Sequence, residues 1–480
     1  MNKIAISLVI FLVGSPALAH RDGAYYHDSG DLTHRPSWMA SIKDETKITR
    51  ISIPGTHDTA SRHYEDITKN QTLDIRQQLD AGIRYFDIRL KSVHDSLHLY
   101  HGPMYLWQTF NKVMTITRDF LEEHPSETVL MRIKKEQPDL SLVFNFEENV
   151  NHHINLFSDT FWHTGSSSYI PSLSEVRGKV VILKDYSGSQ VTGIRYSQFD
   201  IQDNFSMSTN WDLYDKWLSV KEHLKKANTN QSDKGYITYL SASGGSFPYF
   251  VASGHMSNGT GASRLSTGLT TPGWKNSYPD FPRTSCFIGI CTISFEGTNT
   301  LTRDYLKRSD MVYAGIVGAD FPGEDLISKV IDLNERAGIT KTKDEPFAIR
   351  NTKYQGCFDF RGGVSSGKSL SLNSNCHATG SQVFKYDPNT KQLKINGTNF
   401  CLDVESGQNN HRQPVIGYSC HSGKNQQWLL NSDRTISSKM DGTRRCLDVD
   451  EHRLDNHGNP TLTMWECSPS SQDQQFDFVR

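Results

Sequence analysis

The stretch Ile51-Ser52-Ile53-Pro54-Gly55-Thr56-His57-Asp58 joins a short apolar, β-prone run to a histidine and an aspartate. Similar runs recur along the chain and alternate with segments whose apolar residues are spaced as on one face of a helix. The runs are Arg50–Ile53, Ile83–Arg89, Leu97–Tyr100, Val129–Lys134, Lys179–Lys184, Tyr236–Leu240 and Met311–Val317. Strands that alternate with helices predict a largely parallel sheet, and seven or eight such units favour an α/β fold of the TIM-type (β/α) barrel class.

Polar side chains follow these runs directly. In chain order they are His57 and Asp58, Asp87 and Arg89, His101, Lys134, and Asp320. Because the strands of a parallel barrel all end on one face, we expect these side chains to converge there. Two imidazoles can serve as base and acid in one turnover, and an arginine can hold the non-bridging oxygens of a phosphate. The set predicts phosphodiester cleavage without a metal ion, since Arg89 would repel Ca²⁺.

Composition limits the classes of function. The 480 residues carry 51 basic and 53 acidic side chains, and the mean hydropathy is −0.55. The even charge balance argues against a nucleic-acid binder or a polybasic membrane binder, and the hydropathy excludes a multispanning membrane protein. At about 150 residues per domain, the length suggests about three domains, or one large barrel with an appendage.

Residues 1–19 have the pattern of a secretory signal peptide. Lys3 precedes the apolar run Ile4–Val13, and Ala17-Leu18-Ala19 is a small-x-small cleavage pattern. The run is too short to cross a bilayer, which takes about 20 apolar residues. We therefore expect a secreted, extracellular protein that begins near His20.

Export into an oxidising compartment lets cysteines pair. Six of the eight cysteines fall in the last part of the chain as successive, nearly equally spaced pairs. No Cys-x2-Cys or His-x3-His spacing favours a metal site. Four local disulfides are the simplest connectivity, namely Cys286 with Cys291, Cys357 with Cys376, Cys401 with Cys420, and Cys446 with Cys467.

The C-terminal cysteines belong to a threefold internal repeat. Each unit begins Cys-x-Asp, at Cys357, Cys401 and Cys446, and closes with a glutamine shortly before an aromatic residue, at Phe384, Trp428 and Phe476. Three short β-rich units that cannot bury a core alone predict an all-β trefoil. The repeat resembles the ricin-type β-trefoil lectin domain over about 354–480. With residues 1–19 removed, we expect a catalytic barrel over 20–345 and this lectin domain over 346–480.

The resemblance implies sugar sites in which an aspartate binds hydroxyl groups, an aromatic ring stacks on the sugar, and an asparagine assists. The middle lobe has all three, namely Asp403, Tyr418 and Asn425. The third lobe has Asp448 and Trp465 but Asp473 for the asparagine, and the first has Asp359 but Ser374 for the aromatic. Alternatively, the aspartates are turn formers and the aromatic rings are half-buried cover.

The N-terminal region resembles the bacterial phosphatidylinositol-specific phospholipase C family over about 35–330. The matching motifs are Ile51–Asp58, Phe86–Arg89, Tyr100–Pro103, Ser126–Met131 with Lys134-Lys135-Glu136, Lys179–Lys184 followed by Tyr186–Ser189, and Ser243-Gly244-Gly245. The resemblance implies that His57 deprotonates the inositol 2-hydroxyl, oriented by Asp320, and that His101 protonates the departing diacylglycerol oxygen, assisted by Asp58. Arg89, beside Asp87, binds the phosphate. The expected products are a 1,2-cyclic inositol phosphate and diacylglycerol, without a cofactor.

Four further positions concern the headgroup. Lys134 matches a ligand-contacting lysine and is favoured over its neighbour Lys135, because only one of the two can point into the barrel. Asp203 matches a hydroxyl-binding acid. Asp185 stands where the family has an arginine that contacts inositol, and Phe205 stands where it has a tyrosine. These departures predict altered headgroup recognition rather than altered chemistry.

Membrane and glycan contacts are expected as well. The family dips exposed aromatic side chains into the membrane from loops around the mouth. Here 246–250 keeps such a rim, but 64–72 contains no tryptophan, which predicts weaker binding to the bilayer. A sugar-binding trefoil would compensate by tethering a peripheral, monomeric enzyme to glycosylated surfaces.

Three alternatives remain at the level of sequence. One is another barrel phosphodiesterase, such as a glycerophosphodiesterase or a sphingomyelinase-D-like enzyme, which would depend on Mg²⁺ and acidic ligands. Another is a secreted lectin with an inactive barrel. The third is an enzyme that releases glycosylphosphatidylinositol-anchored proteins by the same chemistry.

Overall fold

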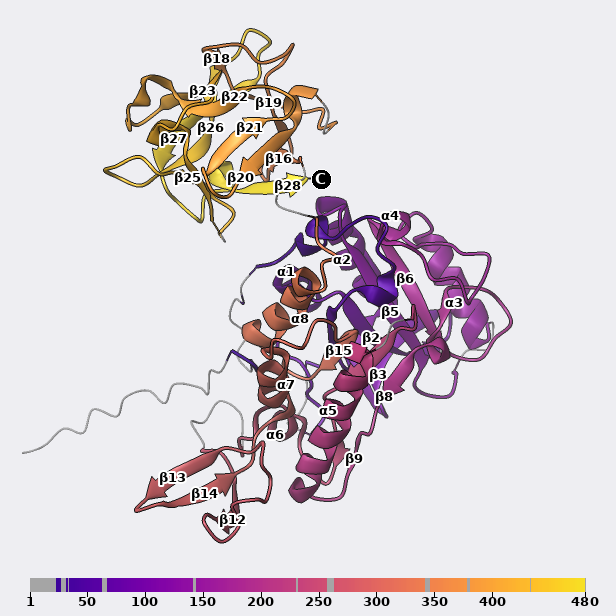
Figure 1. Cartoon of the computed structure of the whole chain (residues 1–480). Coiled ribbons are helices and arrows are strands. Elements are labelled where there is room, and N and C mark those ends of the chain that lie inside the picture. Colours follow the sequence, from indigo (N-terminus) through magenta and orange to yellow (C-terminus); the bar gives the residue numbers. More distant parts are fainter. Residues whose placement is uncertain are drawn as a thin grey trace, which may run out of the picture. The chain divides into compact units, whose positions relative to one another are not determined.

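The computed structural model describes residues 23–26, 32, 34–62, 67–140, 144–229, 232–256, 263–341, 346–377, 380–431 and 433–479. The chain forms two compact units (Figure 1), which are Met1–Pro36 with Asp44–Ile339, and Ser37–Lys43 with Thr340–Arg480. The main boundary thus lies a few residues before the predicted one, and the predicted signal peptide lies outside the described residues. Within the described residues, no helix has the length and hydropathy needed to traverse a bilayer.

Within the described residues of the first unit, eight parallel strands form the main path of its largest sheet, in the order β7-β6-β5-β2-β1-β15-β10-β8. In β6 the run Val180–Leu183 is apolar and fully buried, which is typical of a parallel sheet covered on both faces. In chain order the strands are β1 (Ile53–Thr56), β2 (Tyr85–Val93), β5 (Thr128–Lys135), β6 (Lys179–Asp185), β7 (Ile194–Arg195), β8 (Asp200–Gln202), β10 (Tyr236–Tyr239) and β15 (Ile316–Ala319).

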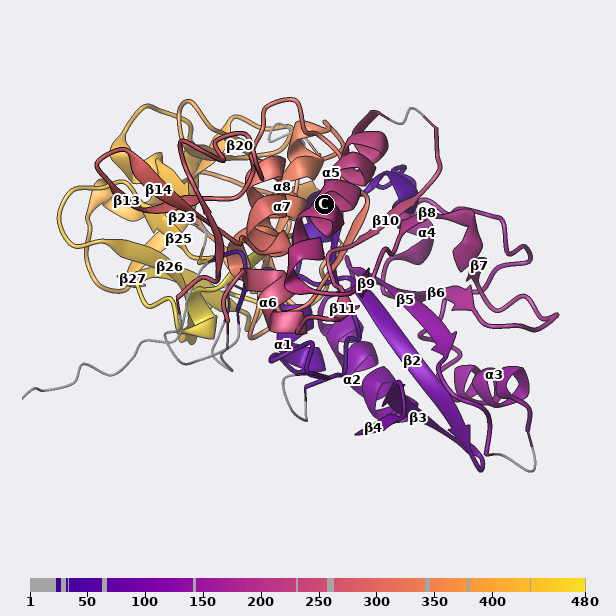
Figure 2. The same cartoon turned by 90° about the horizontal axis from the view of Figure 1, so that it is seen from below.

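Helices lie outside this sheet (Figure 2). Helix α1 begins at a capping box in which Asp74 and Gln77 bond each other's backbone N–H, and α5 buries Leu213, Trp217 and Leu224. The helices are α1 (Ile75–Ala81), α2 (Phe110–Glu123), α3 (Phe146–Leu156), α4 (Leu173–Val176), α5 (Leu213–Thr229), α6 (Pro248–Ser253), α7 (Thr298–Leu306) and α8 (Glu324–Arg336). The predicted TIM-type architecture is confirmed.

One predicted barrel strand is wrong. The run Leu97–Tyr100 lies in β3 (Ser96–His101), which is antiparallel to β2 and continues into β4 (Met104–Thr109). The reason is the length of β2. Its first part, up to Leu90, pairs with β5, and its last part, from Leu90 to Val93, extends further and pairs with β3.

A small antiparallel sheet interrupts the barrel between α6 and α7. Its strands are β12 (Ser266–Thr270), β13 (Arg283–Phe287) and β14 (Ile290–Ser294), paired in the order β12-β14-β13. It projects from the barrel beside α6 in Figure 1. A further short pair, β9 (Ser206–Met207) with β11 (Ser243–Gly244), lies in the loops that follow β8 and β10.

The second unit is built from short β-strands around one core. The closing aromatics of the three repeats, Phe384, Trp428 and Phe476, are at most 1% exposed and belong to this core. The strands are β16 (Ala348–Asn351), β17 (Cys357–Asp359), β18 (Lys368–Ser369), β19 (Ser371–Asn373), β20 (Phe384–Asp387), β21 (Gln392–Ile395), β22 (Phe400–Val404), β23 (Gln413–Ser419), β24 (Trp428–Leu430), β25 (Ile436–Ser438), β26 (Arg445–Leu454), β27 (Pro460–Glu466) and β28 (Phe476–Val479). The all-β repeat prediction is confirmed.

All four predicted disulfides are present. Three of them each join the first strand of a trefoil lobe to the segment that follows its partner strand, at Cys357, Cys401 and Cys446. The fourth, between Cys286 and Cys291, crosses the β13–β14 hairpin. Each closes a short local loop.

Candidate active site and sugar-binding sites

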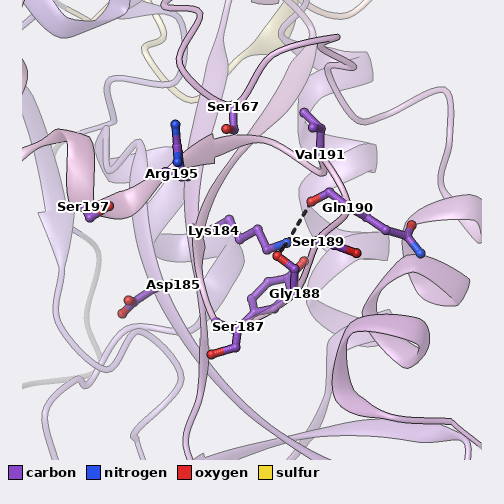
Figure 3. A pocket seen from close by; sticks show the side chains of 11 residues that line it. Ser167, Lys184, Asp185, Ser187, Gly188, Ser189, Gln190, Val191, Arg195 and Ser197 are labelled. Atoms are coloured by element: carbon purple, nitrogen blue, oxygen red, sulfur yellow. Dashed lines mark hydrogen bonds between the residues drawn. The ribbon is translucent and has the colours of Figure 1, made fainter.

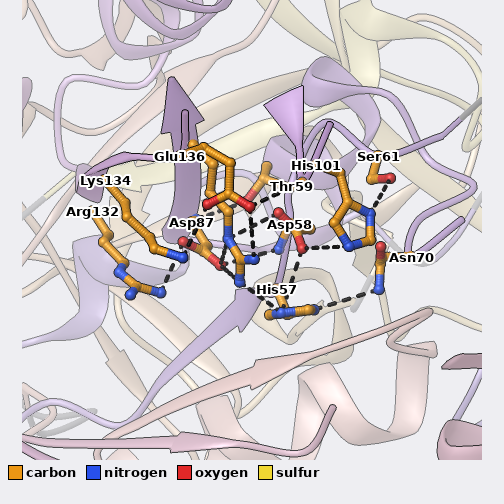
Figure 4. Close-up of polar contacts among 12 residues, drawn as sticks. His57, Asp58, Thr59, Ser61, Asn70, Asp87, His101, Arg132, Lys134 and Glu136 are labelled. Atoms are coloured by element: carbon orange, nitrogen blue, oxygen red, sulfur yellow. Dashed lines mark hydrogen bonds and ion pairs between the residues drawn. The ribbon is translucent and has the colours of Figure 1, made fainter. Parts of the chain in front are cut away.

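The end of β1 supplies two polar side chains because the chain turns sharply there. Asp58 has φ +40°, a left-handed conformation that aspartate tolerates better than most residues. Its N–H donates to Asp87 Oδ2 at 3.2 Å, which ties this turn to β2. The turn places His57 and Asp58 in one cluster (Figure 4), and backbone strain of this kind recurs at active sites.

His57 is held from both ring nitrogens. Nδ1 lies 2.9 Å from Asp320 Oδ1, and Nε2 lies 2.8 Å from Arg89 Nη2. Since arginine only donates, Nε2 is the acceptor, and the ring proton is on Nδ1 and points at Asp320. Burial lowers the pKa of His57, but the charges of Asp320 and Asp58 outweigh it and the net shift is upward. The neutral ring therefore presents an unprotonated, basic Nε2.

Arg89 is bound most closely by two carboxylates. Its Nε lies 2.9 Å from Asp58 Oδ1 and its Nη2 lies 2.9 Å from Asp87 Oδ2. Burial lowers the pKa of Arg89, yet these two charges raise it well above its ordinary value. The remaining nitrogen, Nη1, is 3.8 Å from Glu136, beyond hydrogen-bonding distance. Its protons are available for an anionic oxygen.

His101 reaches the cluster on the return strand of the β2–β3 hairpin. Its Nδ1 lies 3.0 Å from the Thr68 carbonyl oxygen, which only accepts, so Nδ1 carries a proton. Its Nε2 lies 3.5 Å from Asp58 Oδ2, the same distance that separates this oxygen from Nε2 of His57. Asp58 thus lies between the two imidazoles, of which His101 is the more exposed, at 23% against 14%.

Strand β5 contributes residues at alternating positions, as expected for side chains on one face of a strand. Lys134 Nζ lies 2.9 Å from Glu136 Oε2, whereas Lys135 binds Asp139 outside the cluster. The second Glu136 oxygen accepts from the Gly102 N–H at 2.9 Å and so holds the turn after His101. Glu136 was not predicted as a site residue, although its position two residues after Lys134 was a usable signal.

Arg132, on the same face of β5, was also missed. Its Nη1 lies 3.1 Å from Asp87 Oδ1 and 3.1 Å from Tyr239 Oη, and its Nη2 lies 2.6 Å from Asp185 Oδ2. Burial raises the pKa of Asp87, but Arg89 and Arg132 together hold it well below its usual range. The anion introduced at Asp185 is therefore neutralised by a cation from the adjacent strand.

Two predicted headgroup residues lie on the loop after β8. Asp203 and Phe205 follow β8 and are exposed, Phe205 by 59%. Nearby, Lys216 of α5 is buried and donates to Gln202 Oε1 at 3.2 Å, and burial lowers its pKa to about 7. In the predicted aromatic rim, Phe247 is 51% exposed, but Tyr249 and Phe250 are buried in α6. The rim prediction is wrong for these two rings, because α6 packs them inward.

A polar pocket of about 480 Å³ adjoins Asp185 (Figure 3). It is shaped by the loop after β6, which Lys184 holds through bonds to the carbonyl oxygens of Gly188 and Gln190 and an ion pair with Glu147 at 2.7 Å. The hydroxyl and charged side chains in its lining are Ser167, Lys184, Asp185, Tyr186, Ser187, Ser189, Arg195 and Ser197. Through Asp185 and Arg132, the pocket is continuous with the ion-pair network of the cluster.

The middle trefoil lobe gathers the side chains predicted for a sugar site. Asp403 accepts from Asn425 at 3.0 Å and from Gln426 at 2.7 Å, and its Oδ2 lies 3.2 Å from His421 Nε2. Tyr418, on the partner strand β23, is 44% exposed. The network fixes the carboxylate beside an exposed ring, an arrangement that suits stacking on a sugar.

The other two lobes differ from it. In the first, Asp359 is 4% exposed and bonded by Asn373, Ser381 and Gln382, with no aromatic partner of the predicted type. In the third, burial raises the pKa of Asp448 to about 6, and the charge of Asp473 adds to the shift. Asp473 pairs with Lys353 at 2.9 Å, and the ring of Trp465 packs 3.8 Å from that of His411.

Comparisons with known proteins agree with both units. Residues 47–186 match the phosphatidylinositol-specific phospholipase C X domain, and residues 345–476 match the ricin-type beta-trefoil lectin domain. The 1-phosphatidylinositol phosphodiesterase of Staphylococcus aureus (strain Newman) is 31% identical over 255 residues, which cover 46% of this chain and 80% of that protein. The chain belongs to the phosphatidylinositol-specific phospholipase C family.

Two further family members extend this comparison. The 1-phosphatidylinositol phosphodiesterase of Listeria monocytogenes is 38% identical over 176 residues, so that the match spans 34% of this chain and 53% of that phospholipase C. The solved phospholipase C structure from the same organism aligns at 25% identity with a TM-score of 0.45, covering 63% of this chain and 99% of that one. The X-domain match includes His57, Arg89 and His101, whereas Asp320 lies beyond it.

Proposed function

We propose that this chain cleaves the phosphodiester of phosphatidylinositol, or of its glycosylated derivatives, without a metal ion. The observation that carries the proposal is the cluster in which two imidazoles flank Asp58 and Arg89 has one nitrogen, Nη1, held only by a long ion pair of 3.8 Å with Glu136. Arg89 lies among the carboxylates of this cluster, where a divalent cation would meet a fixed positive charge. Family membership gives the substrate class.

The first step is attack by the inositol 2-hydroxyl on phosphorus. His57 Nε2 takes the hydroxyl proton, and Asp320 receives the hydrogen bond from Nδ1 and stabilises the resulting imidazolium. Arg89 turns from Nε2 of His57 to the phosphate and binds a non-bridging oxygen through Nη1 and Nη2. Asp87, fixed between Arg89 and Arg132, keeps the guanidinium oriented.

The second proton transfer completes the reaction. As the new bond from the inositol oxygen to phosphorus forms, the bond from phosphorus to the glycerol oxygen breaks, and His101 in its protonated form gives that oxygen the Nε2 proton. The products are the 1,2-cyclic inositol phosphate and diacylglycerol. The net result is transfer of one proton from the inositol hydroxyl to the glycerol oxygen. Lys134 of β5 and Glu136, which follows the strand, flank the phosphate site.

The test is incubation with phosphatidylinositol in mixed micelles plus a strong chelator, followed by ³¹P NMR. We expect a cyclic phosphodiester resonance that is unaffected by the chelator and absent with His57→Ala. Loss of turnover with the chelator would instead support a Mg²⁺-dependent phosphodiesterase. If wild-type and His57→Ala chains are equally inactive while glycan binding persists, the chain is a lectin with an inactive barrel.

We further propose that the enzyme is secreted, acts as a monomer at membrane surfaces, and is tethered to glycans by its middle trefoil lobe. The four local disulfides support an oxidising destination, and the Asp403 network beside Tyr418 supports the sugar site. The test compares hydrolysis on vesicles with and without glycolipid. Tyr418→Ala should remove the advantage of the glycolipid and leave hydrolysis of plain vesicles unchanged, and an undiminished advantage would contradict the tether.

A further inference from the structure

The tip of the β13–β14 hairpin exposes large apolar side chains. Phe287 is 73% exposed, Ile288 83% and Ile290 53%. Phe287 pairs with Ile290 across the hairpin, so Ile288 and Gly289 form the two-residue turn. From 284 to 295 the sequence contains no charged residue. These side chains form one contiguous apolar projection, here called the hairpin tip (287–290), in contrast to the scattered single residues that are normal on a surface.

The turn itself departs from the residues that its backbone favours. Ile288 has φ +46° and Gly289 has φ +78°, the conformations of a turn in which asparagine or aspartate followed by glycine is the preferred pair. A β-branched residue with positive φ is strained. Isoleucine at this position therefore costs stability that asparagine would not, and the apolar side chain serves some purpose other than forming the turn.

The hairpin is held in shape at two points, by a disulfide below its tip and by packed side chains at its base. The Cys286–Cys291 disulfide joins its strands directly below the tip. At the base, Phe281 and Phe295 pack against each other with ring centroids 5.6 Å apart, and Arg264 pairs with Glu296. The side chains of the hairpin tip can therefore enter a lipid phase without unfolding the hairpin, because the disulfide and the packed base, not the tip, hold its two strands together.

The hairpin also starts from the end of the barrel that carries the active site. Helix α7 follows it immediately, and the first turn of α7 is bound to the carboxyl ends of two barrel strands. Thr298 Oγ1 donates to the Leu240 carbonyl at 3.0 Å, and Asn299 Nδ2 donates to the Asp320 carbonyl at 2.8 Å. The base of the hairpin is therefore on the same face of the barrel as His57 and its partner Asp320.

We propose that the hairpin tip inserts into the interfacial region of a lipid bilayer and anchors the barrel at its substrate. This rests on the proposed function only in that the substrate is a membrane lipid. A convex, uncharged, apolar projection suits a deformable lipid phase rather than a protein groove. Trp274, 55% exposed on the loop that Thr271 ties to Cys291, and its neighbour Lys275 are residue types that favour the boundary between headgroups and acyl chains.

The test is partition of the full chain onto phosphatidylcholine vesicles, which carry neither phosphatidylinositol nor glycan. The triple variant Phe287→Ser, Ile288→Asn, Ile290→Ser removes the apolar tip and retains a favourable turn. We expect about 10- to 100-fold weaker partition, on the scale of withdrawing two or three partly buried apolar side chains from lipid. The matched control is Leu156→Ser. Leu156 is the last residue of α3 and is 57% exposed, and this change should leave partition unchanged.

The remaining outcomes discriminate clearly. Hydrolysis of a monomeric, short-chain substrate should be equal in the wild type and in the triple variant, which shows that the variant is folded and active. Partition of the triple variant equal to that of the wild type would overturn the proposal, and so would a concentration-dependent dimer that the triple variant abolishes while vesicle binding persists. If the wild type binds vesicles, the variant does not, and neither cleaves phosphatidylinositol, the anchor stands and the proposed function fails.

Discussion

Replacing Asp320 by asparagine tests the role of the His57 partner. The pair is joined by a 2.9 Å bond, and the Asp320 side chain is only 2% exposed. An asparagine of the same shape can donate to Nδ1, which would move the ring proton to Nε2 and leave no lone pair facing the substrate. In well-characterised catalytic histidines, loss of general-base function or of the correct tautomer costs about 10²- to 10⁴-fold in kcat. We expect a fall in kcat within this range and little change in KM.

The same substitution should change the pH dependence. The base acts only when neutral, so kcat/KM falls as the pH drops below the pKa of His57. The charge of Asp320 is the leading influence that raises this pKa against the effect of burial. Its removal should therefore move the acidic limb of the profile to lower pH.

The assay is the initial rate on a soluble short-chain phosphatidylinositol between about pH 4 and pH 9, which covers the range over which histidine titrates in proteins. The matched control is Asp332→Asn on α8, where the side chain is 36% exposed and paired with Lys329. This control should leave both rate and profile unchanged. An acidic limb that stays in place for Asp320→Asn, or a kcat reduced less than about tenfold, would refute the role given to Asp320.

Three other predictions follow from the structure. Arg132→Met leaves Asp87 and Asp185 without the cation that they share, and should lower the free energy of unfolding by about 3–5 kcal/mol in urea titrations. Arg132→Lys should recover part of this loss. An unchanged unfolding midpoint for Arg132→Met would contradict the bridging role. His101→Ala should slow cleavage of the natural substrate far more than cleavage of an analogue with a nitrophenol leaving group, which needs no proton, and equal losses would exclude His101 as the acid. Asp448 binds its proton more tightly in the folded trefoil, with a pKa of about 6, so its ionisation destabilises the fold as the pH rises. Asp448→Asn should therefore raise the thermal midpoint of the trefoil at pH 8 but not at pH 4. Equal gains at both pH values would contradict a destabilising charge on Asp448.

The architecture could be predicted from the sequence wherever a simple pattern of residues marked a structural element. Apolar runs that end in His57, Arg89 and Asp320 identify parallel strands that open on one face, and evenly spaced cysteines identify repeats that share a core. It failed where pairing depends on strand length. Strand β3 has the composition of a barrel strand, and only the overhang of β2 beyond β5 determines that β3 folds back beside it.

Side-chain partners on neighbouring strands were the second feature that could not be predicted from the sequence. Asp185 alone indicated a reversed charge at the headgroup site, because its neutralisation by Arg132 depends on the adjacency of β5 and β6 in space. Similarly, 246–250 showed an aromatic rim, but helix formation by α6 turned Tyr249 and Phe250 inward. The apolar tip at 287–290 was not predicted, since four residues between two cysteines show no periodicity.

The two proton transfers of the proposed reaction depend on different parts of the fold, because His101 lies on the β3–β4 hairpin and not on a strand of the barrel. The groups that activate the nucleophile come from barrel strands, whose positions are locked by parallel neighbours on both sides. The proton donor for the leaving group comes from an appended two-strand extension, and among the described strands β2 is the barrel strand with which it pairs. Substitutions along β3 and β4 can therefore shift preference among leaving groups while the machinery of attack stays in place, and an engineer seeking new lipid classes would begin there.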